Sequence, residues 1–299
     1  MSKKTAQQET TAPVRKKKKN ALPALATAGP VSLWMILFVT IPMIYIIVIS
    51  FMSRSVFGDV VMQPTLESYK TIIDPTYFKV ILESIKIAGI TTGLCLLIGY
   101  PLAYFIARKP KDVAARLITL LMIPFWTSSL MRLNSWLTFF QQKGPVNTFL
   151  MNVGIIDEPI SFLYTNGLVM LGLLTNMLPF AVLPLYSTIE KLDKSLLEAS
   201  NDLGADRKTT FLRITLPITF PGLFSAIILV FIPSLGIYTV TDILGGGKVL
   251  FIGNIIKNQF GLVRNWPLGA ALSVLLMVIT LLLIFIYTRF AKMEDMEVI

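Results

Sequence analysis

From Asp193 to Pro217 the chain has the sequence DKSLLEASNDLGADRKTTFLRITLP. This polar stretch separates two long apolar runs, and its leucine and alanine residues recur at helical spacing. Asp193 is placed to cap a short helix that ends at Gly204, and Asp206 to cap a second one that closes before Pro217. We therefore expect two short amphipathic helices joined by a glycine bend, lying beside a membrane and facing either lipid headgroups or another protein.

Three features of this stretch resemble the EAA loop of ABC-importer permeases. They are Glu198-Ala199-Ser200, Gly204 six residues after the glutamate, and Ile214-x-Leu216-Pro217. Ser200 stands where that family has a second alanine. In the family this loop docks into a cleft on a cytoplasmic ATPase subunit, so the resemblance implies the same contact here. The residues that it assigns to the contact are Glu198, Ala199, Gly204, Leu216 and Pro217. We call Asp193–Pro217 the coupling loop; the alternative is an interfacial helix pair without a protein partner.

The composition is that of an integral membrane protein. Of the 299 residues 54% are hydrophobic and only 15% are charged, whereas soluble domains carry about 25% charged residues. The chain has no histidine, and its one cysteine, Cys95, lies in an apolar run. This excludes a disulfide framework and disfavours zinc sites, Ser-His-Asp chemistry and a membrane-embedded enzyme in general. We expect no catalytic residue, no metal and no cofactor in this chain, ATP being bound by a partner subunit.

Six apolar windows are each long enough to cross a bilayer, which takes about 20 helical residues. They are Ser32–Phe51, Ile87–Ala107, Leu117–Phe139, Asn166–Tyr186, Gly222–Thr241 and Leu268–Tyr287. All are free of charged residues except the third, which Arg132 interrupts. The expected fold class is an all-α integral membrane protein with six transmembrane helices. The resemblance implies the type I ABC importer permease fold, with the coupling helices between spans four and five.

Lysine and arginine predict the orientation. With a cytoplasmic N-terminus, the inside segments hold eighteen of the 27 Lys and Arg residues, including the block Arg15–Lys19, and nine lie elsewhere. We therefore expect a multi-pass protein of the bacterial cell membrane with both termini cytoplasmic. The net charge of +10 is accounted for by anionic lipid rather than nucleic acid. The expected divisions are a basic tail (1–30), the first transmembrane helix with an outside loop (31–78), a five-helix core (79–290) and a second cytoplasmic tail (291–299).

The outside segments carry weaker signals. The segment from 52 to about 86 ends in FKVILESIK, which favours a helix lying at the interface, and Phe149–Val153 is expected to dip back toward the membrane. The last outside loop, 242–266, contains a glycine-rich run before Lys248. Val249 replaces the Ser or Thr that a phosphate loop requires, so a flexible loop is expected there.

Four further motifs resemble the permease subunits of spermidine/putrescine importers, the PotB-like family. They are Pro124-Phe125-Trp126-Thr127-Ser128, Leu183-Pro184-Leu185-Tyr186-Ser187, Thr188-Ile189-Glu190-Lys191-Leu192-Asp193 and Trp266-Pro267-Leu268-Gly269-Ala270-Ala271. The resemblance implies an ATP-driven polyamine importer in which this chain forms half of the translocation pathway. The partners that it implies are a second, PotC-like permease, two PotA-like ATPase subunits and an extracytoplasmic PotD-like polyamine-binding protein.

A path for a polyamine needs carboxylates for the ammonium groups and aromatic faces for the cations and methylenes. Asp242 is expected to end the fifth span beside Tyr238 and Thr241, and Trp126 is a further candidate. Carboxylates so close to a span are costly and therefore usually functional. In the alternative interpretation Asp242 is a solvated helix end and the aromatic residues are interfacial anchors.

Three smaller patterns concern packing. Arg132 is expected to snorkel outward or to be paired, and Gly89 and Gly93 to mark a close helix contact. Pro124 and Pro179 are expected to kink their helices.

Two transport alternatives stay open at this level. One is the permease of another ABC importer for a different small cationic or polar solute. The other is a self-sufficient secondary transporter, which would need intramembrane ionisable residues that these spans almost entirely lack.

Overall fold

The computed structural model of the chain describes residues 29–55 and 57–297. Most of the basic tail expected at 1–30 lies outside the described residues. The contacts divide the chain into two units, Met1–Tyr45 and Ile46–Ile299. The elements are η1 (Ile36–Thr40), α2 (Ile41–Ser50), β1 (Met52–Arg54), β2 (Val60–Pro64), α3 (Glu67–Ile72), α4 (Pro75–Ala107), α5 (Lys111–Met122), η2 (Ile123–Trp126), α6 (Ser129–Phe140), α7 (Pro145–Asn152), α8 (Asn166–Ile189), α9 (Lys194–Asp202), α10 (Arg207–Thr210), η3 (Phe211–Thr215), α11 (Leu216–Gly236), α12 (Thr239–Gly245), α13 (Ile252–Gly261) and α14 (Trp266–Glu297).

Among the described residues, five continuous helices are long and apolar enough to cross a membrane. They are Gly29–Ser50, Pro75–Ala107, Asn166–Ile189, Arg207–Gly236 and Trp266–Ile286. A sixth candidate consists of two pieces, Lys111–Trp126 and Ser129–Asn152, which meet at an angle of 83°. The helical membrane fold expected from the apolar windows is therefore confirmed, and the third span, expected at Leu117–Phe139 with a kink at Pro124, is broken at η2, where Pro124 lies.

Prolines are accommodated in two spans by a wider helical turn. The first span, largely in the first unit, is π-helical over Ile36–Thr40, just before Pro42. The same device appears at Phe211–Thr215, just before Pro217. A proline ring clashes with the carbonyl four residues earlier, and a π turn at that carbonyl relieves the clash. The expectation that Pro217 closes the second coupling helix is therefore wrong, because the helix continues through it into α11.

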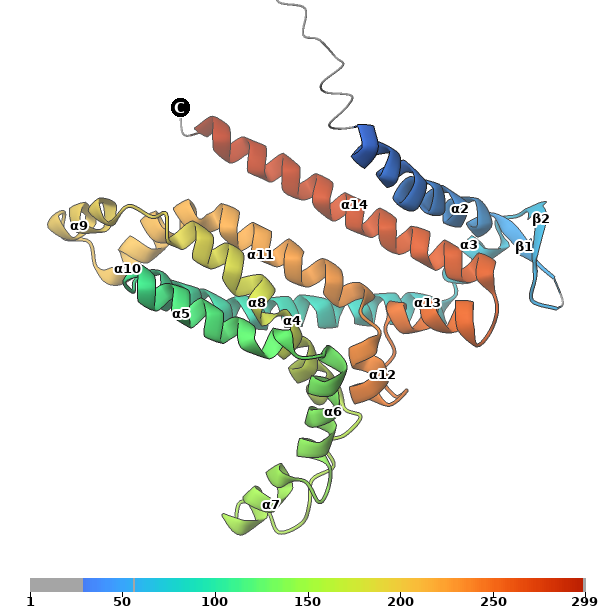
Figure 1. Cartoon of the computed structure of the whole chain (residues 1–299), viewed down its shortest axis with the longest axis horizontal. Coiled ribbons are helices and arrows are strands. Elements are labelled where there is room, and N and C mark those ends of the chain that lie inside the picture. The colour runs from blue at the N-terminus through green and yellow to red at the C-terminus, as the bar shows by residue number, and fades with distance from the viewer. Residues whose placement is uncertain (1–28, 56, 298–299) are drawn as a thin grey trace, which may run out of the picture. The chain divides into compact units, whose positions relative to one another are not determined.

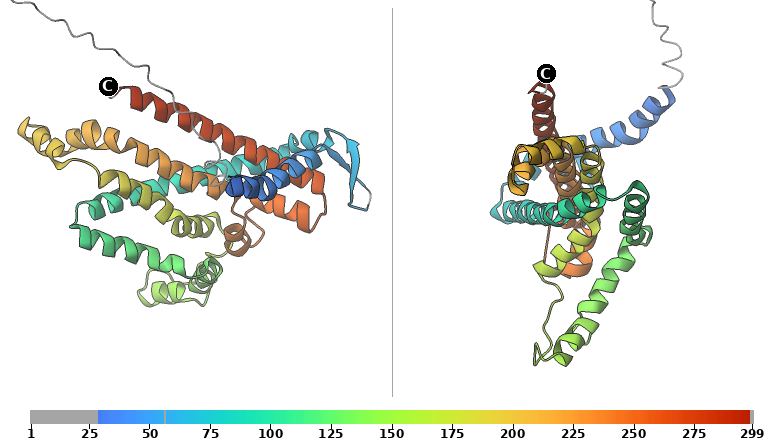
Figure 2. Two further views of the ribbon diagram at one scale, coloured as in Figure 1. Left: turned by 45° about the horizontal axis from the view of Figure 1, so that its top comes forward. Right: turned by 90° about the vertical axis from the view of Figure 1, so that its left-hand side faces the viewer.

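The core of the second unit lies between α4, α8 and α11. Ala103 of α4, Leu185 of α8 and Val230 of α11 are all fully buried in one cluster. The Tyr100 hydroxyl and Thr219 Oγ1 are 2.8 Å apart, a buried hydrogen bond between α4 and α11. Figures 1 and 2 show these three helices side by side along most of their length.

The second span begins earlier than expected. Pro75 is the first residue of α4, and the Asp74 side chain accepts a hydrogen bond from the Thr76 amide at 2.9 Å. Proline at the first helical position and an aspartate cap before it favour this start. The separate interfacial helix expected at FKVILESIK is therefore wrong, because that segment is the first part of α4. The segment before it contains an antiparallel pair, β1 with β2, and the short helix α3.

The third span breaks at η2, and Arg132 is bonded across the break. Its guanidinium donates to the carbonyls of Pro124 and Thr127. It also donates to Asn176 Oδ1 on α8 at 2.8 Å and stacks over the Phe125 ring, 4.6 Å from the centroid. A break inside a span frees backbone carbonyls, and an arginine fork satisfies them. Arg132 is thus paired, as one of the two expected alternatives had it.

The fifth span ends at Gly236, not at Thr241. Ile237 is extended, and the chain then turns into α12. A Cβ on Gly253 of α13 would collide with the Gly236 carbonyl, so the two segments approach through their backbones. The expectation that Asp242 ends the fifth span is wrong, because Asp242 lies on the separate helix α12. The outside loop expected over 242–266 contains the end of α12 and all of α13, and the glycine-rich run continues from α12 into a turn at 246–248.

The glycines expected to mark a close helix contact and the prolines expected to kink their helices differ in their surroundings. A Cβ on Gly89 would lie 4.0 Å from Phe231, but a Cβ on Gly93 would meet nothing within 4 Å. The close contact expected at Gly93 is therefore absent from the described part of the chain. Pro179 is accommodated inside α8, and Pro124 lies in η2, where the third span breaks.

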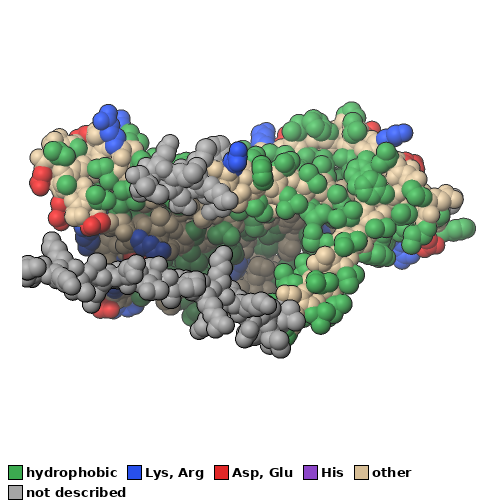
Figure 3. Space-filling model, turned by 90° about the horizontal axis from the view of Figure 1, so that it is seen from above, with side chains coloured by type: hydrophobic (Ala, Val, Ile, Leu, Met, Phe, Trp, Pro, Cys, Tyr) green, Lys and Arg blue, Asp and Glu red, His purple; other side chains and the backbone are tan. Residues whose placement is uncertain are grey.

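Polar and apolar side chains are separated along the helices. On the face drawn in Figure 3, the acidic side chains in view lie toward the two ends, and hydrophobic side chains gather over the right-hand half between them. This is the distribution expected of helices that cross a bilayer. Figure 1 shows α9 and α10 at one end of α11 and α12 and α13 at the other.

Candidate functional site

Local hydrogen bonds build the two helices of the coupling loop. Asp193 caps α9 by accepting from the Ser195 amide at 2.9 Å, and Asp206 caps α10 by accepting from the Thr209 amide at 3.2 Å. The amide bond from Ser195 holds the pKa of Asp193 below its usual value, and hydrogen bonds from the side chain and then the amide of Thr209 lower the pKa of Asp206. The expected caps are therefore confirmed, and both carboxylates are charged at neutral pH.

A pair of hydroxyls ties the two coupling helices together. Ser200 Oγ on α9 lies 2.7 Å from Thr210 Oγ1 on α10, and both side chains are buried. Alanine, which the family has at this position, cannot form this bond. The small-for-small replacement at Ser200 thus adds a buried polar contact between α9 and α10.

Gly204 makes the bend. Its φ is +76°, in the left-handed region that glycine adopts without strain, and a Cβ there would meet nothing within 4 Å. Its amide donates to the Asn201 carbonyl at 2.9 Å, which closes the end of α9. The bend expected from the sequence is confirmed, and the space in front of it is open.

The loop residues fall into two groups. Glu198 and Ala199 are exposed on α9, and the neighbouring Leu203 is 88% exposed although it is apolar. Leu216 instead packs against the core cluster of α4, α8 and α11. Phe211 of η3 meets the ring of Tyr100 edge-on, with centroids 5.6 Å apart. One face of the loop is therefore free, while its last turns are anchored in the core.

At the other end of α11, five residues form what we call the Asp242 cluster. They are Tyr238, Thr241 and Asp242, which precede or lie on α12, and Asn254 and Lys257 on α13. Asn254 is the buried centre and donates to Asp242 Oδ1 at 2.5 Å. Its own Oδ1 accepts from Thr241 Oγ1 at 2.6 Å and from the Phe251 amide at 3.0 Å. The carboxylate is thereby held in one orientation.

Lys257 occupies the second oxygen of Asp242. Its Nζ forms an ion pair with Asp242 Oδ2 and lies over the Tyr238 ring, 5.2 Å from the centroid. The hydrogen bond to Asp242 raises the pKa of Lys257 above its ordinary value. The side chains of Lys257 and Asp242 are 49% and 33% exposed, so this pair is open to solvent. Asp242 is thus neither a free carboxylate nor a plain solvated helix end.

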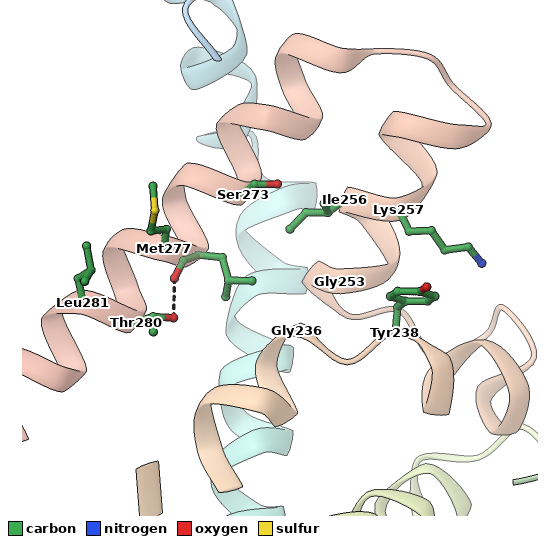
Figure 4. A pocket seen from close by; sticks show the side chains of 10 residues that line it. Gly236, Tyr238, Gly253, Ile256, Lys257, Ser273, Met277, Thr280 and Leu281 are labelled. Atoms are coloured by element: carbon green, nitrogen blue, oxygen red, sulfur yellow. Dashed lines mark hydrogen bonds between the residues drawn. The ribbon is translucent and has the colours of Figure 1, made fainter. Parts of the chain in front are cut away.

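A cavity of about 510 Å³ adjoins this pair (Figure 4). Its wall contains Tyr238 and Lys257 with residues of α11, α13 and α14, among them Gly236, Ser273, Leu276 and Thr280. Figure 4 shows Lys257 and Tyr238 together at one edge, with the ammonium directed away from Ser273 and Thr280. The volume lies within the range of about 300–1,000 Å³ typical of small-molecule sites.

Trp126 lies elsewhere. It belongs to η2 in the broken third span and is 76% exposed, whereas Tyr238 and Asp242 belong to the connection between α11 and α13. A second cavity, of about 480 Å³, lies at the break and is lined by Arg132, Phe125, Trp136 and Pro179 among others. The structure therefore brings together two of the three path residues expected from the sequence, Tyr238 and Asp242.

Comparisons with known proteins identify the family. The family described as "Binding-protein-dependent transport system inner membrane component" matches residues 95–293. The chain belongs to this family. The permease is also 45% identical over 265 residues to the spermidine/putrescine transport system permease protein PotB of Escherichia coli (strain K12), covering 89% of this chain and 96% of the relative. The corresponding protein of Haemophilus influenzae is 43% identical over 265 residues, covering 89% of this chain and 93% of the relative.

Solved structures support the same fold. The permease resembles a chain of a bacterial alginate ABC transporter in complex with an alginate pentasaccharide-bound periplasmic protein, with a TM-score of 0.76 at 16% identity. The match covers 92% of this chain and 95% of that chain. The permease therefore has the type I ABC importer permease fold and is a multi-helix component of the inner membrane.

Sequence reasoning missed Asn254, Lys257 and Asn176. Asn254 and Lys257 are three residues apart, as neighbours on one helix face would be, but nothing local connects them with Asp242, twelve and fifteen residues earlier. Asn176 sits in an apolar window and meets Arg132 only because α6 and α8 pack together. A polar residue inside an apolar window was the available signal for Asn176.

Proposed function

We propose that this permease forms half of the translocation pathway of an ATP-driven polyamine importer for spermidine and putrescine. The observation that carries the proposal is the 45% identity, over 89% of the chain, to a permease named for these two substrates. The chain itself hydrolyses no ATP in this proposal. Its coupling loop transmits the conformational change of a partner ATPase to the spans, and the chain needs no cofactor of its own.

The coupling loop is the proposed docking element for the ATPase. Glu198, Ala199 and Gly204 lie toward the free face of the loop, where exposed Leu203 offers an apolar contact. Motion of α9 is passed on by the Ser200–Thr210 pair to a helix that runs without interruption into α11. Leu216 and Pro217 lie at the start of α11, where the helix meets the core, so a push on the loop moves the fifth span.

The proposed complex has four kinds of subunit. They are this permease, a second PotC-like permease, two PotA-like ATPase subunits and a PotD-like extracytoplasmic polyamine-binding protein. Asp242, Tyr238 and Trp126 are the proposed contacts of the substrate within this half of the pathway. The termini and the coupling loop are cytoplasmic, and the Asp242 cluster faces outside.

Uptake of labelled spermidine by vesicles that contain the assembled complex tests the function. ATP inside the compartment that holds the ATPase is expected to drive uptake, and the ATPase is expected to copurify with the permease. Uptake without ATP would instead indicate a secondary transporter. A complex that hydrolyses ATP but accumulates another small cationic or polar solute would assign a different importer.

Labelling of introduced cysteines tests the orientation. A membrane-impermeant thiol reagent added from outside is expected to react at Asp59→Cys and Lys143→Cys and not at Glu198→Cys. Cys95, the only native cysteine, is fully buried and provides a silent background. The reverse pattern would place the coupling loop outside and overturn the proposed contact with a cytoplasmic ATPase.

A further inference from the structure

We propose that Lys257 is a tethered cation that occupies the substrate's ammonium subsite in the resting permease and is displaced when the substrate arrives. The inference rests on the proposed polyamine function and adds a specificity-determining residue to it. The subsite consists of the Asp242 carboxylate and the face of Tyr238, and Lys257 Nζ contacts both.

The geometry around Nζ is what an alkylammonium ion requires. A carboxylate oxygen neutralises the charge, and an aromatic face lies within about 6 Å, the range of cation–π attraction. A lysine side chain ends in the same group as a polyamine, a primary ammonium on a methylene chain. The Asp242 carboxylate and the Tyr238 ring, which bind the Lys257 ammonium, therefore also suit the terminal ammonium of a diamine or triamine.

The Lys257–Asp242 ion pair allows a ligand ammonium to replace Lys257. Both partners are partly exposed, so Lys257 leaves the carboxylate without abandoning a buried charge. Asp242 does not move with it, because Asn254 holds the other carboxylate oxygen from a buried position. The subsite thus keeps its shape whether its cation is Lys257 or a ligand.

The cavity beside the pair offers room for the rest of the ligand. Its lining includes Ile256, Leu276 and Met277, which offer an apolar wall for methylenes, and Ser273 and Thr280 of α14 (Figure 4). Lys257 and Tyr238 stand at its edge. The other ion pair among the described side chains, Lys86 with Glu83, joins residues three positions apart on one helix.

Occupancy by Lys257 has a measurable consequence. Ligand affinity is reduced in proportion to the fraction of molecules whose subsite is free. Removal of the lysine is therefore expected to lower the apparent KM for spermidine, whereas removal of a purely structural brace raises it. Because the directions are opposite, one measurement separates the two roles.

The experiment uses Lys257→Cys in the assembled complex, in vesicles that take up labelled spermidine. We expect the variant to lower the apparent KM about tenfold. Aminoethyl methanethiosulfonate, which restores a cation at this side chain, is expected to return the KM to the wild-type value. Hydroxyethyl methanethiosulfonate, which adds similar bulk without charge, is expected to leave it low. The wild-type complex treated with each reagent controls for thiols in the partner subunits.

Lys248→Cys is the matched control. Lys248 lies in the same connection between α11 and α14, over the Tyr164 ring at 6.0 Å, and forms no ion pair among the described side chains. The Lys248→Cys variant loses the same positive charge but leaves the Lys257–Asp242 ion pair in place. The apparent KM for spermidine is therefore expected to change less than about twofold. An equal fall in both variants would show general electrostatics and overturn the proposal.

Two further outcomes overturn it. An unchanged or raised KM in Lys257→Cys, with normal uptake by the wild type, would make Lys257 a brace for α12 and α13. No polyamine uptake by the wild-type complex would refute the proposed function and the subsite with it. The wild-type control distinguishes these two failures.

Discussion

The coupling loop and the Asp242 cluster lie at opposite ends of α11 and are held by contacts of different range along the chain. In the coupling loop, each cap joins residues two or three positions apart, and the longest side-chain bond, Ser200 to Thr210, spans ten. In the Asp242 cluster, Asn254 reaches back twelve residues to Asp242 and Lys257 fifteen. Local contacts leave one face of the loop free for a partner, whereas the longer ones enclose a buried amide.

The difference shows how each region serves its proposed role. A docking element needs an exposed surface of fixed shape, and caps with a glycine bend provide shape without burying that surface. A cation subsite needs a carboxylate that stays in place when its cation changes, which a buried amide provides. Six variants, two of them matched controls, sharpen or break this comparison.

Gly204→Asp is expected to have the largest effect. Its side chain would project from a residue with φ +76° into the open space where the ATPase is proposed to dock. We expect ATP-driven uptake to fall about a hundredfold, equivalent to ~2.7 kcal/mol of docking free energy, while the protein still inserts. Uptake and ATPase copurification are measured together.

Gly247→Asp is its matched control at the other end of α11. Gly247 has φ +77° and nothing within 4 Å of an added Cβ, so the backbone strain is the same. We expect near-normal uptake from this variant. Equal losses in both would show that strain, rather than a partner surface, explains the effect.

Asn254→Ala probes the buried centre of the Asp242 cluster. It leaves the Phe251 amide without its acceptor, whereas Thr241 Oγ1 still donates to the Tyr238 carbonyl at 2.8 Å, and an orphaned buried group costs about 1–3 kcal/mol. We expect the unfolding free energy of the permease to fall by ~2 kcal/mol, measured by thermal or denaturant unfolding in detergent. Asn201→Ala, exposed in the coupling loop, should change it by less than about 0.5 kcal/mol. Similar losses would contradict the distinction between local and enclosed contacts.

Asp242→Asn removes charge from the subsite and keeps its shape. A carboxylate attracts an ammonium by ~4 kcal/mol at about 4 Å and an effective dielectric near 20, and water and salt remove much of that. We expect the apparent KM to rise about tenfold, or ~1.4 kcal/mol, and to rise more for the triamine than for the diamine. Basal ATPase activity should persist because the coupling loop is untouched. An unchanged triamine-to-diamine ratio would remove Asp242 from the path.

The smallest expected effect is that of pH on stability. Acid should weaken the coupling loop, whereas alkali should weaken the Asp242 cluster. The pKa values of Asp193 and Asp206 lie below the usual 3.8, so their caps stabilise the loop above that pH and the contribution is lost as pH falls through the lower folded values. The pKa of Lys257 lies above the usual 10.5, so its pair stabilises the cluster below that pH and is lost as pH rises through the folded value. Hydrogen exchange of the Ser195 and Thr209 amides measures the acid limb. The Asp193→Asn variant keeps a cap and should abolish the acid sensitivity at α9.

Much of the fold follows from local properties of the sequence. Apolar windows about 20 residues long predict spans because each backbone polar group in lipid must bond within its own helix. The caps at Asp193 and Asp206 and the bend at Gly204 were predictable because these interactions join residues a few positions apart, where the residue type itself fixes the geometry.

The remaining features depend on which helices pack together. The third span breaks at η2, where Pro124 lies, but only the packing of α6 against α8 brings Asn176 to the Arg132 that bonds the carbonyls freed there. The fifth span ends at Gly236 because α13 packs its backbone at Gly253 against it, and Pro217 continues a helix because a π turn removes its clash. The sequence by itself thus determined the spans, the caps and the family resemblance. Only the tertiary structure decided that Asp242 meets Asn254 and Lys257, because the free energy of those contacts exists only once α12 and α13 are placed side by side.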